Sequence, residues 1–209
     1  MNTSLSAAQE LARYTKIVRR LKWKLPYLAA GYHKATDTND EEEVRAEAEL
    51  MLKLDFFEYY MLIERALVHL LGVFGISVPS GATDGVIVNG RGGYERQHRF
   101  HQNVLEALND RDNPLHTVLG TGDVYFALCK AKDLRNRWKR ADEEHPRDAR
   151  VGLQAYDLEG MLELIFAGFD AGYEIAQARV DGMLEGDSCE KPGEGQWDFM
   201  VDAMDWEAV

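Results

Sequence analysis

The chain has 209 residues, of which 45% are hydrophobic, so it is long enough to bury the core of one globular domain and to carry a tail. Its formal net charge of -12 argues against a protein that binds nucleic acid or anionic membranes over its whole surface. The two cysteines are too few for a disulfide framework, and no stretch is apolar enough for a secretory signal or a membrane span. We therefore expect an intracellular protein, in the cytoplasm or the nucleus, without membrane contact.

The first predicted helix begins at a capping box, in which Ser6 and Gln9 each satisfy a free backbone donor of the other. The helix is expected to end near Leu25. Pro26 should then kink it or restart it as a second piece over 27–34, because proline lacks the backbone N–H that a helix interior needs.

The same stretch is strongly basic. From residue 1 to residue 34 there are seven Lys or Arg residues and one acid, a net charge of +6. Such a helix presents either an ordinary solvated face or a docking surface for an acidic partner. The residues of the predicted basic docking face are Arg13, Lys16, Arg19, Arg20 and Lys24.

The longest predicted helix runs from Glu41 to Phe74, and the rest of the chain should pack around it. Apolar residues recur at spacings of three and four along its whole length, which is typical of an amphipathic helix with a broad buried stripe. Asn39 is expected to cap its first N–H groups, and Pro79 prevents the helix from continuing.

Residues 76–93 are rich in glycine and predict a long loop with a short strand-like stretch at 86–88. The run 89–93 lacks the Gly-Lys-Ser/Thr ending of a phosphate-binding loop. A helix over 94–108 follows. Its Glu95 and His98 have the spacing of di-iron ligands, with His101 one turn further, but a di-iron bundle needs a second such motif, which the chain lacks. We therefore predict no metal site and no cofactor.

Asn113 and Pro114 are expected to open a short turn through Leu119, with the asparagine as the N-cap. Two further helices are predicted over 123–144 and 157–184. The second contains three glycines four or eight residues apart, and glycine is costly in a helix interior. These glycines should therefore let neighbouring helices approach closely. The three residues are Gly160, Gly168 and Gly172.

The segment 134–145 holds the strongest catalytic candidate, because Arg140 and His145 are separated by four residues and lie beside several cations. Here the chain resembles the HEPN superfamily of helical bundles, many of which are metal-independent ribonucleases. The resemblance spans about residues 43–184 and implies that Arg140 and His145 act on a scissile phosphate, across a dimer. Arg135 and Asn136 match the Arg-polar start of the family motif, but His145 lies too far along the chain for that register.

The last residues form an acidic segment with several large apolar side chains. From residue 181 to residue 209 there are nine acids and one lysine, a net charge of -8. As a helix, this segment would present one apolar face of the kind that docks into grooves of other proteins, or onto the basic N-terminal helix of its own chain. The alternative is a plain solubilising tail. The candidate partner-binding residues are Trp197, Phe199, Met200, Val201, Met204 and Trp206.

Taken together, these patterns predict an all-α bundle of about five main helices around a long central helix, over 1–186, with an acidic linker and amphipathic tail over 187–209. The favoured function is a non-enzymatic protein–protein interaction module. The alternative is a HEPN-type ribonuclease, so an enzymatic role stays open. A protein partner, the chain's own N-terminal helix and a homodimer are the interactions to test, whereas nucleic acid is disfavoured by the charge.

Overall fold

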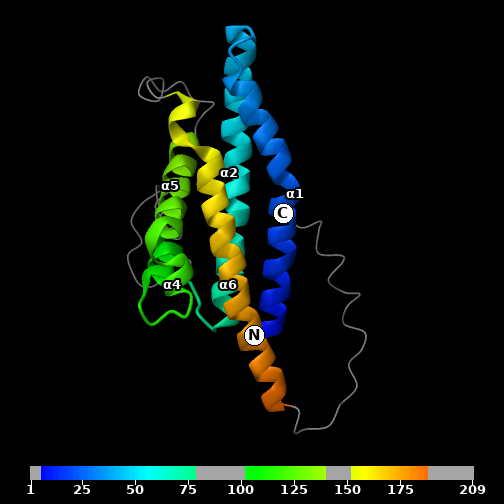
Figure 1. Cartoon of the computed structure of the whole chain (residues 1–209), viewed down its shortest axis with the longest axis vertical. Helices are drawn as coiled ribbons and strands as arrows, with labels where there is room; N and C mark the ends of the chain where they lie inside the picture. Colours follow the sequence, from blue (N-terminus) through cyan, green and yellow to red (C-terminus); the bar gives the residue numbers. More distant parts are fainter. Residues whose placement is uncertain (1–5, 79–101, 140–151, 188–209) are drawn as a thin grey trace, which may run out of the picture.

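The computed structural model describes residues 6–78, 102–139 and 152–187, which form an all-α helical bundle (Figure 1). No β-strand occurs within these three ranges. Helices α1 (Ala7–Thr36) and α2 (Glu42–Val73) form a long antiparallel hairpin. Helices α5 (Gly122–Trp138) and α6 (Leu158–Asp187) pack against this hairpin, and its tip extends beyond them. The predicted fold class is confirmed.

Helix α1 begins as predicted, but it does not stop and restart at Pro26. Ser6 is the N-cap, with both bonds of the capping box to Gln9, and the helix then continues unbroken through Pro26 to Thr36. Proline costs about 3 kcal/mol in a helix interior. The packing of α1 on α2 both before and after Pro26 outweighs this cost. The Tyr59 hydroxyl also donates a hydrogen bond to the Leu21 carbonyl (3.1 Å), just over one turn before the proline.

Helix α2 matches the predicted central helix to within one residue at each end, and it contacts α1, α5 and α6. The predicted cap at Asn39 is wrong. Glu41 is the N-cap and makes no side-chain capping bond, while the backbone N–H of Asn39 donates to the carboxylate of Asp37 (2.9 Å) in the turn before it. Glu42 and Glu43 in the first turn still complement the helix dipole.

The hairpin is held together by two apolar stripes with alternating spacings of three and four residues. This is the heptad spacing of coiled coils, in which side chains of one helix fill the gaps of the other. Each Leu or Phe that becomes fully buried contributes about 1.5–3 kcal/mol. On α1 the stripe consists of Leu11, Tyr14, Val18, Leu21, Leu25, Leu28, Tyr32 and Ala35, and on α2 of Leu52, Phe56, Tyr59, Ile63, Ala66, Leu70 and Val73.

Helix α6 closes the bundle, and two of its glycines have the packing role predicted for them. A Cβ atom at Gly172 would lie 2.9 Å from a methyl group of Leu70 on α2, and one at Gly168 would collide with Val124 on α5. Gly160 is different, because its neighbour is the carboxylate of Asp157, which accepts from the Gly160 N–H (3.3 Å) at the start of the helix.

The remaining described elements are short and lie, along the chain, between α2 and α5 or between α5 and α6. Residues 102–109 are helical, α4 runs from His116 to Leu119, and a 3₁₀ turn (η2) covers Leu153–Tyr156. Leu115, and not Asn113, is the N-cap of α4, but Asn113 caps the turn that precedes α4, as predicted. Asn113 is buried, accepting from the Leu115 N–H (2.9 Å) and donating to the Ala107 carbonyl (2.6 Å). The predicted loop and strand over 79–93 lie outside the described residues.

Candidate functional site

The outer face of α1 carries an exposed aromatic pair. Trp23 and Tyr27 leave 64% and 65% of their surface open to solvent, and their ring centroids lie 5.4 Å apart. Lys16 and Arg19 precede them at spacings of three and four residues, so all four side chains share one stripe of the helix. This stripe lies opposite the residues that pack on α2.

Four of the five residues predicted for the basic docking face are exposed on α1. Arg13, Lys16 and Arg19 make no ion pair with any residue in the described ranges, and Arg20 is exposed beside them. Lys24 lies at the edge of this face, half-buried, with its Nζ atom 3.8 Å from Glu58 on α2. The face therefore combines cations with two aromatic rings. We call it the basic-aromatic face, and it consists of Arg13, Lys16, Arg19, Arg20, Trp23 and Tyr27.

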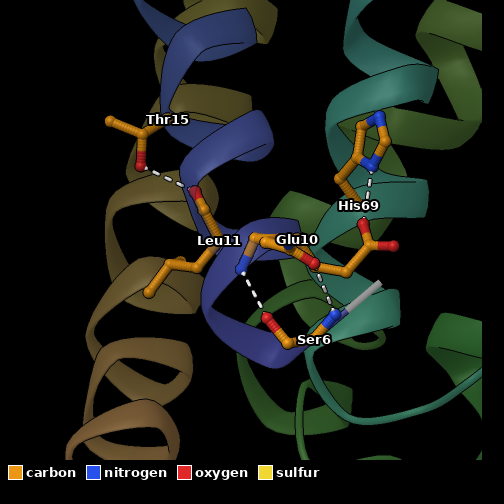
Figure 2. A network of polar contacts seen from close by, with 6 residues as sticks. Ser6, Glu10, Leu11, Thr15 and His69 are labelled. Carbon is orange, nitrogen blue, oxygen red and sulfur yellow. Dashed lines mark hydrogen bonds and ion pairs between the residues drawn. The ribbon is translucent and has the colours of Figure 1, made fainter. Parts of the chain in front are cut away.

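The beginning of α1, just before this face, is fixed by polar contacts at its base (Figure 2). Glu10 reaches from α1 to the Nδ1 atom of His69 on α2 (2.7 Å), and both side chains are largely buried. Gly72 leaves room for this carboxylate, since a Cβ atom there would lie 2.9 Å from the Glu10 Cδ atom. In addition, the buried Tyr14 hydroxyl donates to the Phe169 carbonyl of α6 (2.7 Å). The face is thus presented by an anchored helix.

A groove lies on the other side of the same helix, between α1 and α6. It has a volume of about 590 Å³, within the range of ligand pockets. Its walls are mainly apolar, and its α6 edge carries Glu159, Glu163 and Asp170, all exposed. Lys22 pairs with Asp170 (3.2 Å) and lies over the ring of Phe166 (5.9 Å).

Arg135, which matches the Arg-polar start of the HEPN motif, is fully buried inside the bundle. Its guanidinium stacks on Phe57 (4.6 Å), Nη1 donates to Asn136 (3.0 Å) and Nη2 approaches the sulfur of Met61 (3.7 Å), while Nε has no partner among the described residues. Burial lowers the pKa of Arg135, and the nearby carboxylate of Glu64, also buried, opposes that shift. In this structure, therefore, Arg135 does not face solvent.

The other candidate residues lie outside the described residues. This holds for the predicted catalytic pair Arg140 and His145, and for Glu95, His98 and His101, whose spacing resembles that of di-iron ligands but for which no metal site was predicted. It also holds for the predicted partner-binding residues Trp197, Phe199, Met200, Val201, Met204 and Trp206. Within the described ranges, no group of three or more His, Cys, Asp or Glu residues could hold a metal ion.

Trp23 and Tyr27 were not among the candidates that the sequence suggested. Their signal was their spacing, because they continue the stripe of Lys16 and Arg19 and fall between the heptad positions that face α2. Among the described helices, none is both long and apolar enough to cross a membrane. Comparisons with protein-family models, curated proteins and solved structures find no match to this chain.

Proposed function

We propose that this protein is a non-enzymatic protein–protein interaction module that binds acidic, apolar-rich segments through the basic-aromatic face of α1. The observation that carries the proposal is the pair Trp23 and Tyr27, each about two-thirds exposed and in ring contact, on a helix face that also carries several exposed cations. Exposed tryptophan and tyrosine are costly in water and are enriched among the residues that dominate binding energy. Cations around them favour an acidic partner.

The acidic segment near the end of the chain supplies the second element of this proposal. It pairs tryptophan and other large apolar residues with aspartates, which is the chemistry that the basic-aromatic face would recognise. It could bind α1 of its own chain or a similar face on another protein. In either case, the partner-binding residues are Trp197, Phe199, Met200, Val201, Met204 and Trp206.

A defined probe tests the proposal. A labelled peptide of residues 195–209 is titrated with the full chain and with a chain that ends at Asp187, the last residue of α6. We expect micromolar binding to the shortened chain, about tenfold or more weaker after Trp23→Ala or Arg19→Glu. Weaker binding to the full chain would show that its own segment competes.

Matched variants control for unrelated effects. Phe126→Ala removes an aromatic ring that is 72% exposed on α5, and Arg111→Glu reverses an exposed charge away from α1. Both should leave peptide affinity unchanged. If they weaken it as much as Trp23→Ala and Arg19→Glu do, or if the peptide does not bind at all, the proposal is wrong.

The ribonuclease alternative stays a prediction, with Arg140 as the cation and His145 as the general acid or base. Its test is cleavage of single-stranded RNA in the presence of a chelator. Activity that disappears in both Arg140→Ala and His145→Ala would replace the interaction proposal with this one.

A further inference from the structure

The groove between α1 and α6 has the dimensions of a helix-binding site. Its α6 wall extends from Leu158 to Asp170, which is about 18 Å, or roughly three turns of helix. Both walls are helical, so a third helix could lie between them with its side chains in the spaces of each. The apolar lining that a bound helix would meet is Leu25, Pro26 and Ala29 from α1, and Leu162, Phe166 and Ala167 from α6.

The α6 rim of the groove is acidic. Glu159 and Glu163 are one turn apart on α6, both exposed, and neither makes an ion pair with a residue in the described ranges. Asp170 continues the same edge but is already paired with Lys22. Two carboxylates are thus available beside an apolar groove.

We propose that this groove binds a basic amphipathic helix of a partner protein. Apolar residues of the partner at i, i+3, i+4 and i+7 enter the groove, and its lysines or arginines pair with Glu159 and Glu163.

Charge excludes the chain's own acidic segment as the occupant. Asp198, Asp202 and Asp205 would approach Glu159 and Glu163, and like charges in such proximity oppose binding. The groove and the basic-aromatic face therefore select partners of opposite charge, on different sides of one helix. This inference concerns a surface other than that of the proposed function, so each can fail alone.

The test uses a synthetic helix of about 14 residues, with leucine at the spacing given above and lysine elsewhere. A second peptide carries glutamate in place of lysine. Affinities for the full-length protein are measured by calorimetry. We expect micromolar binding of the lysine peptide and at least tenfold weaker binding of the glutamate peptide.

Four variants locate the binding. Ala167→Trp fills the groove without changing charge, and Glu163→Lys reverses one rim charge, so each should weaken binding of the lysine peptide about tenfold or more. Glu174→Lys makes the same charge change on an exposed residue of α6 outside the groove, and Trp23→Ala alters only the basic-aromatic face. Both should bind nearly as the wild type does. Urea titration confirms that each variant is folded.

Several results would overturn the inference. Equal affinity of Ala167→Trp and the wild type would mean that the peptide binds only the net negative charge. Failure of the lysine peptide to bind would show that a basic helix is not the ligand of the groove. Sedimentation that shows a dimer dissociated by Ala167→Trp would assign the groove to a second copy. Native mass spectrometry that shows a small apolar ligand lost in the same variant would assign it to that ligand.

Discussion

Replacing Arg135 by methionine should destabilise the protein severely, because it breaks a charged cluster in the core. Arg135 has no exposed surface, and Glu64, the carboxylate that most stabilises its charge, is only 3% exposed. Removing one of two buried opposite charges should cost up to about 3–5 kcal/mol, the typical loss when one partner of a buried ion pair is removed, since the other charge remains in a medium that solvates it poorly. For a protein of this size, that loss lowers Tm by about 6–20 °C.

Urea unfolding followed by circular dichroism measures this loss as a change in the free energy of unfolding. Arg111→Met removes an exposed arginine and should stay within about 0.5 kcal/mol of the wild type. The double variant Arg135→Met with Glu64→Leu should recover most of the lost stability, because apolar residues often replace a buried pair without cost. A loss below about 1 kcal/mol in Arg135→Met, or no recovery in the double variant, would contradict this reasoning.

Three further predictions follow from the helices. Gly168→Ala should lower the free energy of unfolding by about 1–3 kcal/mol, because the added methyl group collides with Val124. Gly182→Ala should instead raise it by about 0.5–1 kcal/mol, because nothing lies within 4 Å of the added methyl group. Urea titration of both variants measures the two changes. Pro26→Ala should stabilise α1 by about 1–3 kcal/mol, which a higher Tm would show and an unchanged or lower Tm would refute. Burial raises the pKa of Tyr14 above its ordinary value of 10, so its contribution to stability is complete below pH 10 and is lost as the pH rises further. Above about pH 10 the wild type should therefore lose up to about 1.4 kcal/mol more per pH unit than Tyr14→Phe does, and parallel pH profiles would exclude this effect.

The fold was largely predictable, because its signals are local. The spacing of apolar residues located α2 to within one residue at each end, and Ser6 and Gln9 marked the start of α1. The errors arose where contacts beyond the local pattern determine where a helix begins or ends. Pro26 does not end α1, because α2 packs against the helix on both sides of it, and Asn39 bonds to its own turn instead of capping α2.

The candidate site was only partly predictable. Charge alone identified the cations of α1, but it could not show that Trp23 and Tyr27 stay exposed, since aromatic residues in an amphipathic helix are usually assigned to the core. The groove joins residues from opposite ends of the chain, and no local pattern reveals such a pairing. Arg135 was similarly ambiguous, because an arginine among other cations gives no sign of burial.

The hairpin of α1 and α2 has a consequence for how the chain folds. A connection of five residues, 37–41, joins two helices whose apolar stripes are already complementary, so their contacts close short loops at low entropic cost. The bond from Tyr14 to Phe169 instead spans 155 residues. We therefore expect the hairpin to form early and α6 to dock late. Detachment of α6 from the native bundle would then expose the core while the hairpin persists.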